Sequence, residues 1–251
     1  MYLAVVACLL VGCGRSGFVP RADAAPIDTA DHTVLRVTDG LLVLYTFEEA
    51  TGVVARDVSG VTPLLDVQLG TGADWIPGGI EFRASADAAV SAAPATKITD
   101  ACVASREVTI EAWVAATTTA IGVGAARIVA VGAANNVSAL SLGLEASAYY
   151  GQVRTTTAST KLASTLEATT DLVHLVHART TAGERTLYVD GMQRGASVTD
   201  GTFDNWDATL PVTLGNAVGG GVSWPGRIFL AAIYCRALTP DEVMQNLAAG
   251  P

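Results

Sequence analysis

Carboxylates at alternating positions are the residues of this chain that most suggest catalysis. The segment Glu107-Val108-Thr109-Ile110-Glu111 has the period of a β-strand, which places Glu107, Thr109 and Glu111 on one face. Retaining glycoside hydrolysis needs two carboxyl groups about 5 Å apart. In an extended strand the two glutamates would lie roughly 13 Å apart, with a threonine between them. The pattern therefore predicts a solvated sheet face, and a hydrolase would need other carboxylates facing these across a cleft.

Two histidines form the second candidate for chemistry. His174 and His177 are three positions apart in a strand-like segment, so they point to opposite faces and cannot share one metal ion. We expect both to be structural. The sequence has no Ser–His–Asp order, phosphate-binding glycine motif or Cys–His zinc spacing that would support catalysis. It therefore predicts that the protein is not an enzyme.

Aromatic and acidic residues in loops are the candidates for a binding site. Trp206 and Trp224 both lie in predicted loops, and an indole ring can stack on the apolar face of a sugar. Packing at the edge of the core is the alternative for both rings. The loop around Trp206 also offers oxygen ligands to a cation or a sugar, from Asp200, Asp204, Asn205 and Asp207. The alternative for this loop is a solvated acidic surface.

The amino terminus carries an apolar run, Tyr2 to Val11, that is too short to span a bilayer but suits the core of a signal peptide. Its end, Leu10-Val11-Gly12-Cys13, resembles the lipobox of bacterial lipoproteins. That resemblance implies cleavage after Gly12, acylation of Cys13 and, because Gly14 is not aspartate, delivery to the outer membrane. No Lys or Arg precedes the run, which departs from the usual signal-peptide pattern, and a buried strand is the alternative. Residues 13–39 are small, polar and interrupted by prolines, so we interpret them as a tether.

Charge and cysteine content narrow the class of protein. A net charge of −9 argues against binding to nucleic acid and against simple adsorption to anionic lipid, while 50% hydrophobic residues allow a sizeable core. Removal of Cys8 with the signal and lipidation of Cys13 leave Cys102 and Cys235. An even pair in an oxidising compartment predicts a disulfide, with two free buried thiols as the alternative.

Short strand-like segments separated by turns recur from Leu41 to Tyr234 and predict an all-β sandwich or jelly roll. Asp190-Gly191 has the composition of a tight hairpin turn. One short helix is expected near the carboxyl terminus, where Thr239, Pro240 and Glu242 form a capping pattern. The clearest strands are Leu41–Phe47, Glu107–Val114, Leu140–Leu144, Val173–Arg179, Thr186–Val189 and Arg227–Tyr234.

Several of these segments together resemble the laminin-G-like domains of the concanavalin A superfamily. The resemblance covers Gly40 to about Ala249 and implies two stacked antiparallel sheets, a carbohydrate-binding or adhesive role and, in some members, a calcium ion. The segments that carry it, in order, are Leu42–Glu49 with Arg56–Gly60, Val108–Val114, Thr186–Gly191, Leu214-Gly215, Gly226–Ile228 and Arg236–Glu242.

The resemblance also makes two specific statements about sites. Asp87 matches a position that often binds calcium in the family, but Phe229-Leu230-Ala231 stands where the family commonly has two aspartates, which removes a ligand. The strands near Cys102 and Cys235 are neighbours in this fold, which favours the disulfide.

The sequence as a whole predicts a signal peptide (1–12), a lipidated Cys13 with a tether (13–39) and a laminin-G-like jelly roll (40–251). The expected function is a lipid-anchored module that binds a glycan or a protein at the cell envelope. The alternative is a structural envelope protein without a small ligand. Exposure of Trp206 and Trp224 on one rim would favour the first, and burial of both would favour the second.

Overall fold

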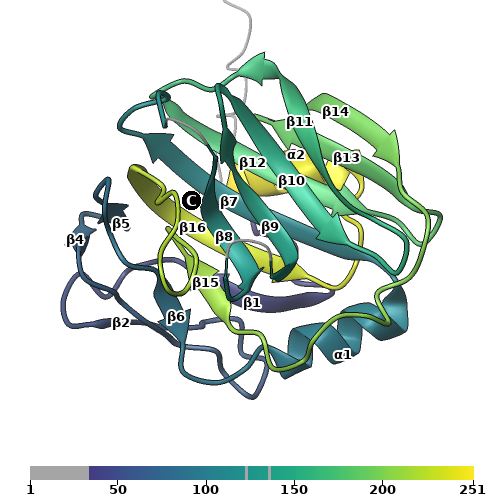
Figure 1. The fold of residues 1–251 in the computed structure, drawn as a ribbon, viewed down its shortest axis with the longest axis horizontal. Coiled ribbons are helices and arrows are strands. Elements are labelled where there is room, and N and C mark those ends of the chain that lie inside the picture. The colour runs from purple at the N-terminus through teal and green to yellow at the C-terminus, as the bar shows by residue number, and fades with distance from the viewer. Residues whose placement is uncertain (1–33, 122–123, 135–136) are drawn as a thin grey trace, which may run out of the picture. The chain divides into compact units, whose positions relative to one another are not determined.

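The computed structural model describes residues 34–121, 124–134 and 137–251, and residues 34–251 form one compact unit. Two antiparallel sheets are stacked face to face (Figure 1). This confirms the predicted two-sheet sandwich. The lipobox, Cys13 and residues 14–33 of the tether lie outside the described residues.

Each sheet mixes strands from distant parts of the sequence. Sheet A runs in the order β14 (Met192–Val198), β13 (Glu184–Val189), β12 (Leu172–Arg179), β7 (Val108–Ala116), β16 (Gly226–Tyr234), β5 (Gly79–Phe82) and β4 (Ala73–Ile76), and β1 (Leu41–Tyr45) also pairs with β16. Sheet B runs in the order β11 (Ser159–Glu167), β10 (Ala148–Arg154), β9 (Ser138–Glu145), β8 (Ala125–Gly132), β15 (Val212–Leu214), β6 (Ala89–Ser91), β3 (Val67–Gln68) and β2 (Val54–Ala55).

The main core fills the space between the sheets. Alternate residues of each strand point inward, as Leu140, Leu142 and Leu144 of β9 do. The predicted hairpin joins β13 to β14, with Asp190 and Gly191 at φ values of 51° and 72°. Positive φ at both central residues is what a type I′ turn requires.

A second apolar cluster covers the outer face of sheet A. Helix α2 (Pro240–Ala249) begins with the predicted capping box, in which Thr239 and Glu242 satisfy each other's backbone N–H groups. Residues 34–38, which the sequence assigned to the tether, pack beside this helix, and the backbone N–H of Val37 donates to Asn246 Oδ1 over 2.8 Å. The cluster includes Val37, Trp113, Val176, Tyr188, Leu230, Tyr234, Leu238 and Val243.

This cover overturns the predicted solvated face of β7. Thr109 and Glu111 are both fully buried: Thr109 exchanges hydrogen bonds with the backbone of Arg236 and Leu238, just before α2, and Glu111 lies under α2 and residues 34–38. Helices that pack on the outer face of a sheet are set by tertiary structure, and the alternation within one strand does not reveal them.

Helix α1 (Thr96–Ser105) was not predicted, since Ala95 at its N-cap provides no side-chain hydrogen bond. It carries Cys102, which forms a disulfide with Cys235 at a Cα–Cα distance of 4.6 Å. The predicted pairing is confirmed. Neither α1 nor α2, the two helices of the described residues, has the length and apolar character needed to cross a membrane.

Candidate functional site

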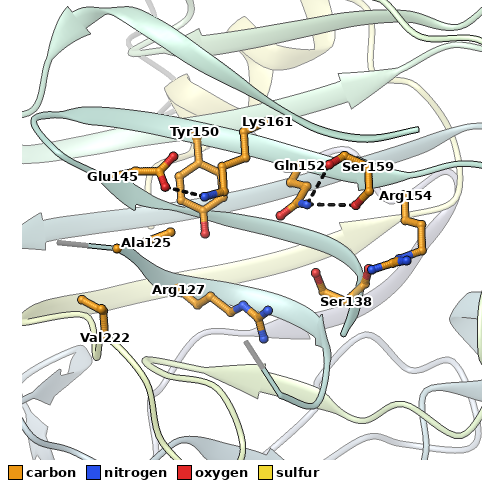
Figure 2. Close-up of a pocket in the computed structure, with 11 residues that line it drawn as sticks. Ala125, Arg127, Ser138, Glu145, Tyr150, Gln152, Arg154, Ser159, Lys161 and Val222 are labelled. Carbon is orange, nitrogen blue, oxygen red and sulfur yellow. Dashed lines mark hydrogen bonds and ion pairs between the residues drawn. The ribbon is translucent and has the colours of Figure 1, made fainter. Parts of the chain in front are cut away.

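A cavity of about 630 Å³ lies on the outer face of sheet B, and we call it the sheet-B cavity. Inward-pointing Tyr149 and Val153 place Tyr150, Gln152 and Arg154 of β10 on this outer face. Figure 2 shows the lining side chains, which come mainly from β8 to β11. Its polar members are Arg127, Ser138, Glu145, Tyr150, Gln152, Arg154, Ser159 and Lys161.

Short polar contacts organise one side of the sheet-B cavity. Lys161 Nζ lies 2.6 Å from Glu145 Oε1 and 5.0 Å from the centre of the Tyr150 ring. Gln152 Nε2 donates to Ser159 Oγ over 3.0 Å, as Figure 2 shows. These contacts join β9, β10 and β11 into a polar surface that offers an amide, a hydroxyl and two charged groups.

Two arginines line the remainder of the cavity. Arg154 Nε donates to the backbone oxygen of Ser138 over 3.0 Å, and Arg127 Nη1 donates to that of Ala133 over 3.5 Å. Burial lowers the pKa of the Arg127 guanidinium, which nevertheless stays protonated at neutral pH. Burial also raises the pKa of Tyr150 to about 12, so its hydroxyl remains a hydrogen-bond donor. The cavity therefore presents three cationic donors together with hydroxyl, amide and carboxylate groups that can accept hydrogen bonds.

A smaller cavity of about 170 Å³ adjoins the first and shares Ser138 and Arg154 with it. Asn205, Trp206 and Asp207 line this second cavity. The Trp206 indole N–H donates to the backbone oxygen of Arg154 over 2.7 Å. The structure thus brings part of the predicted loop site to the border of the sheet-B cavity.

The two tryptophans that the sequence suggested for sugar binding pack within the domain and are not exposed to a ligand. Trp206 is only 7% exposed and stacks on Phe203 with ring centres 4.4 Å apart, while Trp224 is fully buried. Trp224 packs against Gly226, where a Cβ atom would lie 2.6 Å from the indole ring. Neither ring offers an open face to a sugar, which corrects the stacking role considered for them. Asp204 and Asn205 are exposed, and their role in binding stays a prediction.

The acidic residues of the proposed calcium site are dispersed. Asp87 is exposed on a loop, and within the described part of the chain no three His, Cys, Asp or Glu residues cluster to hold a metal. Asp207 Oδ1 accepts from the N–H and the hydroxyl of Thr209, and these bonds lower the pKa of its carboxyl group. Asp204 likewise accepts from the hydroxyl of Thr202. The residues present do not fit a calcium ion.

The glutamates of β7 have separate structural roles. Glu107 accepts from the hydroxyl of Thr181 and the N–H of Ala237 at the end of the strand. Glu111 is enclosed under α2 and contacts His174 and Arg36. A carboxylate in that position cannot face another across an open cleft, which is what the hydrolase alternative required. His174 is buried there as a partner of Glu111, and His177 is buried on the opposite face of β12.

Sequence reasoning missed the sheet-B cavity. The signal was present in Tyr150-Gly151-Gln152-Val153-Arg154, where large polar side chains alternate with small or apolar ones. The same alternation recurs at Ser159 and Lys161 in the next strand. Read together, these positions identify a polar sheet face that is rich in groups able to bind a ligand.

Comparison with known proteins agrees with the two-sheet fold. The sequence profile of the concanavalin A-like lectin/glucanases superfamily matches residues 90–244, which is more than half of the chain, and the chain belongs to that family. Among curated proteins, none matches the sequence.

Solved structures with the same fold belong to larger proteins. A Trypanosoma rangeli sialidase in complex with sialic acid superposes with a TM-score of 0.62 at 17% identity, over 85% of this chain and 33% of that one. The receptor binding domain of botulinum neurotoxin C/D mosaic serotype superposes with a TM-score of 0.66 at 10% identity, over 85% of this chain and 52% of that one. The chain thus spans a third to a half of these proteins, and at such identities the similarity is one of fold.

Proposed function

We propose that this member of the concanavalin A-like lectin/glucanase superfamily is a binding module that takes a carbohydrate in the sheet-B cavity. The observation that carries the proposal is the cavity itself. Its volume of about 630 Å³ falls in the range of roughly 300–1,000 Å³ that ligand pockets occupy. Its lining is dominated by hydroxyl, amide and charged groups, which suit the many hydroxyls of a sugar.

Two neighbours in fold bear on the choice of ligand class, and one of them was solved with a sugar. One is a sialidase solved with sialic acid, and the other is the receptor binding domain of a toxin. We extend the carbohydrate class to this chain on the strength of its own cavity.

Binding to a glycan array by the full-length chain is the test of this function. Replacing Gln152 by leucine removes an amide from the cavity wall, and the loss of its hydrogen bonds should weaken glycan binding about fivefold to tenfold. The matched control is Gln193→Leu, an exposed glutamine on β14 of sheet A. Equal affinity of both variants for every bound glycan would place the ligand elsewhere.

We also propose that a lipid on Cys13 holds the module at the outer membrane. The basis is the lipobox-like Leu10-Val11-Gly12-Cys13, followed by Gly14. Because two or more acyl chains make a stable anchor, Cys13→Ser should abolish incorporation of labelled palmitate and release the protein from membranes. Cys8→Ser is the control and should leave labelling unchanged. A Cys13→Ser protein that remains with the membrane after a carbonate wash would contradict the anchor.

A structural role in the envelope is the second candidate. The burial of both Trp206 and Trp224 favours it, since exposed rings were the feature expected of a sugar-binding rim. In that case the domain packs against a neighbouring envelope protein and takes no small ligand. The same array distinguishes the two, because a structural protein would bind no glycan in a manner that depends on Gln152.

A further inference from the structure

The side chains that line the sheet-B cavity carry a net positive charge, whereas the protein as a whole is negatively charged. Three of its side chains are cationic, Arg127, Arg154 and Lys161, and one is anionic, Glu145. Three positive charges minus one negative charge leave an excess of two positive charges. The chain as a whole carries −9, so the cavity concentrates a positive potential on an acidic molecule. Such focusing in a concave surface attracts ligands of negative charge.

The charged side chains differ in how deeply they lie in the cavity. Glu145 pairs with Lys161 on the more exposed side of the cavity, where their side chains are 45% and 31% exposed. Arg127 is 5% exposed and lies deeper. A guanidinium group has a planar array of donors that matches a carboxylate or sulfate and is held more rigidly than an ammonium group. The base of the cavity therefore suits a planar or tetrahedral anion.

Arg154 extends this positive character along the surface. It lines both the sheet-B cavity and the adjoining small cavity, and its Nε–H bond to the Ser138 backbone holds the side chain between them. A ligand that occupies either cavity can therefore place an acidic group against Arg154.

We propose that the sheet-B cavity selects saccharides that carry carboxylate or sulfate groups, with Arg127 and Arg154 as the residues that bind the anion. This inference rests on the proposed carbohydrate function and names its ligand class. Neutral sugars can fill the same space, but they form no charge-assisted hydrogen bonds with the guanidinium groups, and such bonds are the stronger kind.

The test measures affinity of the full-length chain for three probes by calorimetry. These are a galacturonic acid trisaccharide, a sulfated galactose trisaccharide and a neutral galactose trisaccharide. We expect at least one acidic probe to bind about tenfold or more tightly than the neutral one, since hydrogen bonds to charged groups are the stronger ones. The two acidic probes separate carboxylate from sulfate as the preferred anion.

Variants then assign the effect to the cavity. Arg127→Gln should lower affinity for the acidic probe about tenfold and leave the neutral probe within about twofold. Arg227→Gln is the matched control, because this arginine pairs with Glu81 on sheet A and lies outside the cavity lining. Glu145→Gln is a second variant in an exposed position, and it should strengthen acidic binding several-fold by raising the excess charge. It decides the question even if Arg127→Gln does not fold.

The results that would overturn the inference are distinct from failure of the function itself. If neutral and acidic probes bind equally and Gln152→Leu weakens both, the cavity binds sugar without charge selection. If Arg227→Gln weakens acidic binding as much as Arg127→Gln does, the effect is general electrostatic attraction and the inference is wrong. If none of the three probes binds and the array is also blank, the carbohydrate function fails with it.

Discussion

Lowering the pH from 8 to 5 is expected to reduce the free energy of unfolding by about 2 kcal/mol through His177 alone. This side chain is fully buried between the sheets, and its ring fills the space above Gly151, where a Cβ atom would lie 2.2 Å from it. Burial, together with the nearby charge of Arg185, lowers the pKa of His177 to about 3.

The direction of the effect follows from proton binding. The unfolded chain takes up a proton on this histidine near pH 6.5, whereas the folded protein does so only near pH 3. Between these values the unfolded state binds more protons, so stability falls as the pH falls. Carboxylates such as Glu111 and Glu242, whose pKa values are lowered, lose their contribution only below their unfolded values of 4.5. The interval from pH 8 to pH 5 therefore keeps the contribution of the carboxylates small, and comparison with a variant that lacks His177 separates this side chain from the other histidines.

Urea denaturation at pH 8 and pH 5 measures this contribution. His177→Leu replaces the ring by an uncharged side chain of similar size, and it should remove about 2 kcal/mol of the pH dependence. Neither ring nitrogen has a hydrogen-bond partner within the described structure, so the substitution breaks no polar contact there. An unchanged difference in stability between pH 8 and pH 5 in the variant would show that His177 is not the responsible group.

Features that depend on local sequence were predictable. The capping box at Thr239 and the turn at Asp190-Gly191 are read from neighbouring residues, because their hydrogen bonds and φ values are set within a few positions. The disulfide between Cys102 and Cys235 followed from parity once the other two cysteines were assigned to the signal and the lipid.

Features that depend on packing between distant elements could not be predicted from the sequence. Glu111 alternates with apolar residues like any solvated strand position, and it is buried because α2 and residues 34–38, from the two ends of the domain, pack over it. The sheet-B cavity depends on register as well as on residue type. Register shifts occur beside two of its lining residues, between Arg127 and Val129, where β8 pairs with β9, and between Ala148 and Tyr150, where β10 pairs with β11. A bulge of this kind re-aims side chains in a way that period-two patterning does not encode.

The buried Glu111 network is the place where a single substitution should be most destabilising. One oxygen accepts from His174 Nε2 over 2.8 Å and also contacts Arg36, and the other accepts from Asn246 Nδ2 over 2.8 Å and Tyr234 Oη over 3.2 Å. Burial by itself would raise the pKa of Glu111, but the His174 hydrogen bond and the Arg36 charge hold it below the usual value. The carboxylate therefore stays ionised beneath α2, where it joins β7, β12, β16, α2 and residues 34–38.

Glu111→Ala should lower the free energy of unfolding by about 3–5 kcal/mol at pH 7, since it leaves the Arg36 charge and several buried donors without their acceptor. Glu107→Ala is the matched control on the same strand face, and it should cost about 1 kcal/mol because its carboxylate is only partly buried. Hydrogen exchange at the Val37 amide gives a second measurement. That amide donates to Asn246, which Glu111 holds in place, so exchange should accelerate in Glu111→Ala and stay unchanged in Glu107→Ala. Similar losses of stability in the two variants, with Val37 equally protected in both, would mean that the network does not hold residues 34–38 to the domain.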